Sequence, residues 1–464
     1  MKRLLRATIL LLVRLFGLPG ALAAARKARS SIPTAPRILL IRPDHLGDLV
    51  LTTPILNAIK QHAPGAHITM MVGPRSSEIV ARHPAIDRLI VVPFPGFQRA
   101  PQKALAPYIL LLSVAKQLHP YDLAINLRPD FWWGAALIYL AGIPRRVGYA
   151  LQPGKAFLTH ALPFHTPELA TVSNLRLTSA ALQTLNGHWV RVPTAQQPDE
   201  LPSSLRLQVV GQSERHDKSG PYTPLPEPFS PEAYPLDFQP TAEEQQWVAG
   251  RLKNAGIDAS TPVIVIHPGT GADVKLWRNE GWSRCADALA GVIDRDTEDT
   301  INRVSTSLTF SPPARIILTG SKNERPMLEE IAGGMKTPAL IVTDMTVGQL
   351  AALLGRASLV AGVDNGPLHI AVAQGTPTVQ IFGPTDARIF GPWGSKERHI
   401  VVASTYRCPT CPAIPCGRLD FSPEELPEHP CVRRVTEQQV LMAIEQIMPY
   451  AKHETGAETQ DPAP

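Results

Sequence analysis

The sequence predicts an α/β protein made of two parallel-sheet domains. At 464 residues the chain is longer than a single hydrophobic core usually supports, so two domains are expected. Short runs of apolar, β-rich residues alternate with helix-length segments in both halves, which is typical of βαβ units. Many of the 47 prolines lie between Val192 and Pro240, and this composition predicts a poorly ordered connector or insertion between the halves.

These features divide the chain into five expected segments, in which two Rossmann-like domains face a cleft. The segments are a basic apolar N-terminal segment at 1–35, a first Rossmann-like domain at 36–190, a Pro-rich linker or insertion at 191–245, a second Rossmann-like domain at 246–435 with a cysteine-rich stretch at 408–431, and a C-terminal helix with a disordered tail at 436–464.

Each half contains enough strand candidates for its own sheet. In the first half we expect strands at Ile38–Ile41, Ile68–Val72, Leu89–Val92, Leu123–Asn126 and Arg146–Tyr149. In the second half we expect them at Val263–Ile266, Arg315–Leu318, Ala339–Val342, Leu359–Val363, Thr378–Phe382 and His399–Val402.

The most informative stretch is GVDNGPLHIAVAQGTPTVQIFGPTD, which runs from Gly362 to Asp386. A buried strand ends in the turn Asp364-Asn365-Gly366, and Pro367 stands where a proline favours the start of a helix. A helix start that opens on glycine points free backbone N–H groups at one spot, which favours a bound diphosphate. An ordinary βαβ turn without a ligand is the alternative.

A second loop of the same kind occurs in the first half. The stretch RILLIRPDHLGDLVLTTP begins at Arg37 with a strand and continues into a turn that contains Asp44, Gly47 and Asp48. In doubly wound sheets ligands bind beyond the carboxyl ends of the strands, where both loops are expected to lie.

Together these stretches resemble glycosyltransferase family 9, the ADP-heptose lipopolysaccharide heptosyltransferases and their relatives. Three further stretches fit the family in the expected order: His267 to Trp277, the turn Leu318-Thr319-Gly320-Ser321, and Met345 to Leu354. The resemblance covers most of residues 36–450 and implies the GT-B fold, with the acceptor on the first domain and the donor nucleotide on the second. It also implies that the last helix, Thr436 to Met448, packs back toward the first domain.

The resemblance implies an inverting transfer of a sugar, heptose from ADP-heptose, to a lipopolysaccharide-core or related acceptor. Lys275 would neutralise charge on the leaving diphosphate, and the donor-binding residues would be Thr270, Gly271, Glu324, Met345, Asp364, Asn365, Gly366 and His369. A solvated carboxylate at Glu324 and a core methionine at Met345 remain open as alternatives.

The resemblance places the general base in the pair Gly47-Asp48, and a carboxylate there suits proton removal from an acceptor hydroxyl. Two alternatives stay open: Asp48 caps the nearby helix, or Asp44 is the base. The scheme requires no metal or other cofactor, because a lysine and a helix dipole can replace it. We interpret the DxD-like string Asp294-Arg295-Asp296 as a solvated loop.

Charge indicates an anionic acceptor and no nucleic-acid partner. The net charge is +5, and Arg128, Arg145 and Arg146 lie in the half that the resemblance assigns to the acceptor. A phosphorylated glycolipid would be attracted by these guanidinium groups, whereas ordinary solvated arginines are the alternative. Neither a nucleic-acid-binding motif nor a basic stripe interleaved with aromatic residues is found.

The N-terminus, MKRLLRATILLLVRLFGLPGALAAARKARS, admits two interpretations. A basic start, an apolar run and Ala21-Leu22-Ala23 resemble a cleaved signal peptide. Arg14 and Pro19 interrupt the apolar run, which is far below the roughly 20 residues needed to cross a bilayer. We therefore expect a helix in the membrane interface and a cytoplasmic enzyme that is peripheral on the inner face of the cytoplasmic membrane.

Four of the five cysteines crowd the C-terminal part, at Cys408, Cys411, Cys416 and Cys431. A structural zinc site, two disulfides and packed reduced thiols are the three interpretations, and a cytoplasmic location disfavours disulfides. Cys285 is interpreted as a core residue of a helix.

Two other function classes remain as alternatives. A non-catalytic nucleotide-sugar or lipid-binding protein would share the same loops. A nicotinamide-dependent oxidoreductase is disfavoured, because Arg42-Pro43-Asp44-His45-Leu46-Gly47 stands where a G-x-G-x-x-G would open the first βα turn.

Overall fold

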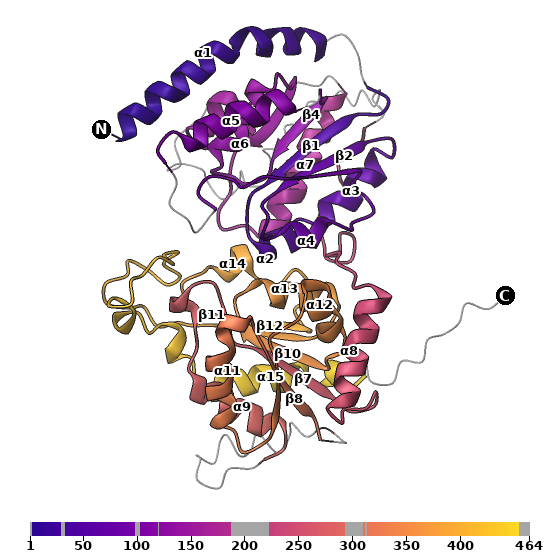
Figure 1. The fold of residues 1–464 in the computed structure, drawn as a ribbon, viewed down its shortest axis with the longest axis vertical. Helices are drawn as coiled ribbons and strands as arrows, with labels where there is room; N and C mark the ends of the chain where they lie inside the picture. The colour runs from indigo at the N-terminus through magenta and orange to yellow at the C-terminus, as the bar shows by residue number, and fades with distance from the viewer. Residues whose placement is uncertain are drawn as a thin grey trace, which may run out of the picture.

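The computed structural model describes residues 2–28, 33–97, 103–118, 120–186, 222–292, 310 and 313–453. These residues form two α/β domains that lie one above the other in Figure 1, each with a parallel sheet between helices. This is the predicted architecture, two Rossmann-like domains in a GT-B-like fold. The string Asp294-Arg295-Asp296 lies outside the described residues.

The first domain contains a six-stranded parallel sheet in the order β3-β2-β1-β4-β5-β6. Its strands are β1 (Arg37–Arg42), β2 (His67–Val72), β3 (Arg88–Val91), β4 (Leu123–Asn126), β5 (Arg145–Tyr149) and β6 (His160–Leu162). Five of the six were predicted. The sixth, β6, was missed because three residues are too few to produce a periodic pattern.

The second domain repeats the same winding, with strand order β12-β11-β10-β7-β8-β9. The six predicted strands are all present, as β7 (Val263–His267), β8 (Arg315–Thr319), β9 (Ala339–Val342), β10 (Leu359–Val363), β11 (Thr378–Phe382) and β12 (His399–Ala403). Each sheet therefore has one point at which the strand order reverses, between β1 and β4 and between β10 and β7.

Helices cover both faces of each sheet. Those that belong to the first domain are α1 (Lys2–Ala28), α2 (Leu46–Val50), α3 (Pro54–His62), α4 (Ser77–Val80), α5 (Ala106–Gln117), α6 (Trp132–Leu140) and α7 (Ala170–Leu185). Those of the second are α8 (Ala242–Asn254), α9 (Asn279–Leu289), α11 (Arg325–Gly333), α12 (Val347–Arg356), α13 (Gly366–Ala373), α14 (Ala387–Phe390) and α15 (Glu437–His453). Among the described helices, none is long and apolar enough to span a bilayer.

The layers follow from the alternation of side chains along each strand. In β1, Ile38 and Leu40 join one buried core, whereas Leu39 and Ile41 face the opposite core, which includes residues of α5 and α6. The first of these cores continues into the second domain, where it includes Val263 of β7. Cys285 is buried in α9, as predicted.

The expected disorder of the Pro-rich segment is corrected for residues 222–240. Tyr222, Tyr234 and Phe238 are buried there, because a proline-rich segment that also carries aromatic side chains can bury enough apolar surface to stay ordered. The segment bonds to both domains: Thr53 Oγ1 accepts from the Asp237 N–H, and Trp393 Nε1 donates to the Tyr234 carbonyl. Residues 191–221 of the expected linker lie outside the described residues.

The last helix also differs from expectation. Val440, Leu441, Ile444 and Ile447 of α15 are buried in the core of the second domain, together with strands of its sheet. The prediction that this helix packs toward the first domain is therefore wrong, because its apolar face is buried within the second domain.

Candidate active site

The functional loops gather at the two points where strand order reverses. The loop after β1 leads into α2, which carries Asp48, and the loop after β4 carries Arg128, while the segments that follow β7 and β10 carry Lys275 and Asp364. The helices α2 and α13 that begin in two of these loops pack against each other across the domains. The two carboxyl edges therefore face one another, which is where doubly wound sheets bind ligands.

Arg42, the last residue of β1, organises the first-domain loop. Its side chain is buried, and its Nε lies 2.6 Å from Asp44 Oδ2 while its Nη1 donates to Asn174 Oδ1 at 3.3 Å. Arg128 pairs with the other carboxylate oxygen of Asp44. Two guanidinium groups thus neutralise Asp44, whose side chain is only 2% exposed.

Asp48 is held more loosely than Asp44. Its carboxylate lies 3.4 Å from Arg42 Nη2, and its side chain is 23% exposed. Burial raises the pKa of Asp48, the nearby Asp44 carboxylate raises it further, and Arg42 and Arg128 oppose both effects. A carboxylate with a raised pKa and an open side is better suited to accept a proton than one that is fully ion-paired. A helix-cap hydrogen bond from Asp48 is not formed, since His45 occupies the cap position of α2.

The predicted acceptor arginines differ in environment. Arg128 is half-buried at the mouth of the site, where it also pairs with Asp130 at 2.7 Å. Arg145 and Arg146 are buried and donate to backbone carbonyls, Arg145 to Thr184 and Arg146 to Phe157 and Ile143. The prediction that Arg145 and Arg146 contact an acceptor is therefore corrected, because their guanidinium groups tie together internal loops of the first domain.

In the second domain Lys275 and Asp364 form one unit. Lys275 Nζ donates to the Asp364 backbone carbonyl at 2.8 Å and lies 3.1 Å from its Oδ2. Thr385 Oγ1 donates to the same carboxylate oxygen at 2.6 Å. These contacts hold the ammonium group of Lys275 beside the start of α13, where it adds positive charge to the helix dipole.

Asn365 and Gly366 form the start of α13. The Asn365 side chain caps the helix by accepting from the Leu368 N–H at 3.2 Å, and its Nδ2 donates to the Gly269 carbonyl at 2.7 Å. Asn365 thereby fixes the loop after β7 to the start of α13. The other backbone N–H groups at the start of α13 have no partner within the helix. Free N–H groups at a helix start can bind a diphosphate.

His369 lies in the first turns of α13 and is buried. Burial lowers its pKa to about 4, so that the imidazole is neutral at pH 7. Its Nδ1 has no hydrogen-bond partner in the described part of the chain. A buried, unpaired ring nitrogen at this position is available to a ligand group.

The other predicted donor residues are spread around the same edge. Glu324 accepts from the Ser321 N–H at 2.6 Å and approaches Gly269 so closely that a Cβ there would overlap the Glu324 carboxylate. Thr270 has a buried hydroxyl with no partner among the described residues, and Gly271 is exposed. Met345 is half-buried and packs against the core shared by both domains.

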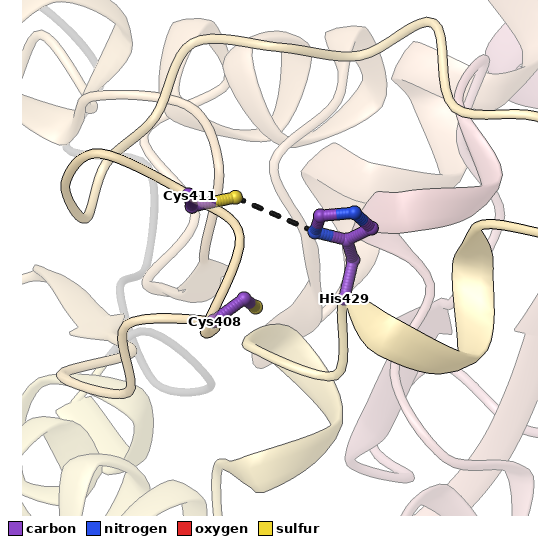
Figure 2. Close-up of side chains that lie close together, drawn as sticks. All are labelled: Cys408, Cys411 and His429. Carbon is purple, nitrogen blue, oxygen red and sulfur yellow. Dashed lines mark hydrogen bonds between the residues drawn. The ribbon is translucent and has the colours of Figure 1, made fainter.

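The cysteine-rich stretch forms a separate cluster, which Figure 2 shows. The side chains of Cys408, Cys411 and His429 approach one another closely, with ligand atoms that all lie within 4.8 Å. Cys411 Sγ lies 3.4 Å from His429 Nδ1. Burial and the neighbouring thiols of Cys416 and Cys408 raise the pKa of Cys411 to about 11. All five cysteines are free, so the disulfide interpretation is wrong for this structure.

Four residues at these sites were not singled out from the sequence. Arg42 is a charged residue at the end of an apolar strand, and Thr385 follows the strand β11 within the quoted stretch, so both carried a usable signal. Asn174 lies inside α7 and His429 lies 18 residues beyond Cys411, and neither position has a local pattern that predicts its contact.

Two facing Rossmann-like domains, with a carboxylate on one edge and a lysine beside a helix start on the other, are an arrangement that suits a transferase of the GT-B-like class. Comparison with known proteins is consistent with this class. The model of the family described as "Glycosyltransferase family 9 (heptosyltransferase)" matches residues 311–416.

Among curated proteins, lipopolysaccharide heptosyltransferase 3 of Escherichia coli is 24% identical over 359 residues, which are 75% of this chain and 84% of that protein. Lipopolysaccharide heptosyltransferase 1 of Pseudomonas aeruginosa is 25% identical over 380 residues, or 81% and 86% of the two chains. The chain is thus similar to family 9 heptosyltransferases over most of its length, and these relatives support glycosyltransferase activity. The two alternative classes, a non-catalytic binder and a nicotinamide-dependent oxidoreductase, find no support in these relatives.

Solved structures agree in fold. The family 9 glycosyltransferase from Veillonella parvula superposes with a TM-score of 0.61 at 20% identity and covers 90% of this chain and 98% of its own. The ADP-heptose lipopolysaccharide heptosyltransferase II of E. coli superposes with a TM-score of 0.57 at 17% identity and covers 90% and 100% of the two chains.

Proposed function

We propose that this glycosyltransferase moves heptose from ADP-heptose to an anionic lipopolysaccharide-core or related cell-envelope acceptor, with inversion of the anomeric centre. The observation that carries the proposal is the approach of the Asp48 loop to the start of α13, with Gly47 against Gly366. A base on one domain and a diphosphate site on the other then lie on opposite sides of a bound sugar.

The donor would bind to the second domain. The N–H groups at the start of α13, Thr270 and Gly271 would contact the diphosphate and sugar, and Glu324 and Met345 would contact the nucleoside. The E. coli heptosyltransferase WaaC, which shares this fold with a TM-score of 0.54, is solved with ADP and also with ADP-2-deoxy-2-fluoro heptose. That donor class, together with the names of the curated relatives, supports an ADP-sugar for this chain.

The transfer would be a single displacement. The acceptor hydroxyl oxygen attacks the anomeric carbon, Asp48 takes its proton, and the bond to the diphosphate oxygen breaks with its electron pair retained by ADP. Lys275 and the α13 dipole would stabilise the charge that develops on the diphosphate, so no cofactor is invoked. Asp48 is preferred over Asp44 because two guanidinium groups already compensate Asp44.

The acceptor would enter from the first domain, where Arg128 is the half-exposed cation. Because Arg128 also pairs with Asp44 and Asp130, an anionic group of the acceptor would join an existing network of charges. A glycolipid acceptor places the enzyme at a membrane, and we propose a cytoplasmic, peripheral position on the inner face of the cytoplasmic membrane.

A structural zinc ion is proposed for the cysteine cluster. Cys408, Cys411 and His429 offer soft sulfur and imidazole ligands within mutual reach, which is the donor set that zinc prefers. Burial and then the neighbouring Cys408 thiol raise the pKa of Cys431 to about 12. Cys431 beside Cys408 and Cys416 beside Cys411 are the candidates for a fourth ligand. The ion would stabilise the fold and take no part in transfer.

The test is a thermal-shift and calorimetric screen of the full chain against ADP-, GDP- and UDP-sugars, followed by incubation with the tightest donor and a deacylated core acceptor. Selective binding of ADP-heptose and release of ADP with a glycosylated product support the proposal. Tight donor binding without release of ADP would instead identify a non-catalytic nucleotide-sugar-binding protein.

A further inference from the structure

Helix α1 has two apolar faces, and one of them is docked on the first domain. Leu10 and Ala21 are buried in a hydrophobic core that also contains residues of α6. A Cβ on Gly17 would lie 2.5 Å from the ring of Tyr139, which belongs to α6. Tyr139 Oη also donates to the Arg14 carbonyl at 2.7 Å. These contacts fix α1 on the outer side of the domain, at the end farthest from the second domain (Figure 1).

The other face of α1 is apolar and has no covering element in the described structure. Phe16 is 81% exposed, and the remaining exposed apolar residues of this face repeat at helical spacing, at Leu11, Leu12, Leu15, Leu18 and Leu22. A continuous stripe of large apolar side chains on the surface of a folded protein marks an interaction site.

A second exposed stripe lies on α5, far from α1 in the sequence. Leu105, Ile109 and Leu112 are exposed at spacings of four and three residues, with Ile109 at 66%. Leu111 on the opposite side of α5 is buried in the same core as Leu10 and Ala21 of α1. The two helices therefore lie on the same side of the first sheet, where both contact α6, and Figure 1 shows them close to each other at the end of the first domain.

The segments that carry the two stripes have charge of one sign. Residues 1–35 contain seven Lys and Arg residues and no Asp or Glu, and the segment from Phe97 to Tyr121 contains Arg99, Lys103 and Lys116 and likewise no acidic residue. Positive charge beside exposed apolar side chains is the combination that binds anionic lipid headgroups, whereas a protein partner of mixed charge would require some complementary acidic groups.

We propose that α1 and α5 together form one docking surface for an anionic lipid bilayer, with the apolar stripes of both helices inserted at the level of the headgroups. The proposal rests on the proposed function, because a glycolipid acceptor requires the enzyme to reach a membrane. The docking proposal adds to the proposed function a defined membrane-binding surface on the first domain. The second domain and its donor site would then face the aqueous phase.

The experiment is flotation of the full-length protein with vesicles of phosphatidylcholine alone or mixed with phosphatidylglycerol. One variant combines Leu15→Glu with Phe16→Glu on α1, and another combines Ile109→Glu with Leu112→Glu on α5. The matched control combines Met442→Glu with Tyr450→Glu, two exposed apolar positions of α15 in the second domain. ADP affinity, measured by calorimetry, shows whether each variant is folded. If a Glu variant does not fold, the milder Phe16→Ser or Ile109→Ser variant takes its place.

We expect the wild type and the control to float with the anionic vesicles, and each stripe variant to lose partitioning by about tenfold or more, because buried apolar area is exchanged for charge. Equal binding to phosphatidylcholine alone, or an α5 variant that binds like the wild type, would overturn the proposal. So would a dimer without lipid that Phe16→Glu dissociates, because the stripe would then bind a second copy. A protein that floats but transfers no sugar would instead refute only the proposed function.

Discussion

Gly47 and Gly366 touch across the two domains. A Cβ on Gly47 would lie 3.0 Å from the Gly366 Cα, and a Cβ on Gly366 would lie 2.9 Å from the Gly47 backbone nitrogen. Neither position has an unusual φ, so the requirement for glycine comes from the close approach and not from backbone conformation. This contact sets the distance between the Asp48 loop and the start of α13.

Replacement of Gly47 tests the importance of that contact. Gly47→Ala would push the two loops apart, because the new methyl group meets backbone and the His369 ring at 3.1 Å. We expect kcat/KM to fall by about 10²-fold, since misplacement of reacting groups by an ångström costs that much, while the melting temperature changes little. Gly250→Ala is the matched control, since a Cβ there has no atom within 4 Å. An unchanged rate for Gly47→Ala would show that catalysis does not need this approach.

Lys275 provides a test of charge stabilisation on the leaving group. Lys275→Ala should lower kcat by about 10²-fold, because the ammonium group beside Asp364 would no longer face the diphosphate. Circular dichroism should show an intact fold, because Thr385 still donates to the Asp364 carboxylate. Lys396→Ala, at an exposed position of the same domain, serves as the control. A normal turnover number would remove Lys275 from the mechanism.

The cysteine cluster is predicted to act on stability. Combined Cys408→Ser and Cys411→Ser should remove equimolar zinc from the purified protein and lower its melting temperature before turnover changes, because metal binding contributes directly to folding. Cys285→Ala lies outside the cluster and should leave the zinc content unchanged. Unchanged melting with abolished turnover would contradict a structural role for the cluster.

Buried histidines predict a loss of stability in mild acid. Burial lowers the pKa of His160, His267, His369 and His399 to about 4 in the folded protein. Because an unfolded histidine titrates near 6.5, the unfolded state binds more protons between about pH 6.5 and 4, and the free energy of unfolding therefore falls as pH decreases through this window.

Urea denaturation at a series of pH values measures that effect. His399→Asn lies away from the active site and should flatten the pH dependence, because one titrating group is removed. A variant with the same pH dependence as the wild type would show that His399 does not contribute to acid sensitivity.

Periodicity was sufficient to predict the sheets but not the positions of individual polar side chains. Of the twelve strands in the part of the chain that the structure describes, eleven were predicted, because buried parallel strands are short apolar runs between turn residues. Asp48, Lys275 and Asp364 were singled out because they follow strand ends, where a parallel sheet concentrates function, and because they fit the family 9 resemblance; their roles stay predictions.

Contacts between distant residues explain what sequence reasoning missed. Arg145 and Arg146 look like surface cations in the sequence, but each finds carbonyl partners only after the chain folds. The pairing of Asn174 with Arg42 joins residues 132 positions apart, and the ordering of Tyr222 and Tyr234 depends on partners in both domains. No local pattern contains that information.

The most direct test of the central claim compares Asp48→Asn with Asp44→Asn in the transfer of heptose from ADP-heptose. Asp48→Asn retains a hydrogen-bonding amide but cannot take the hydroxyl proton, so kcat should fall by about 10²–10⁴-fold while ADP affinity and melting temperature stay near wild type. Asp44→Asn should mainly lower stability, because Arg42 and Arg128 would lose their shared carboxylate. Normal turnover by Asp48→Asn together with an inactive but stably folded Asp44→Asn would contradict the assignment and transfer the role of base to Asp44.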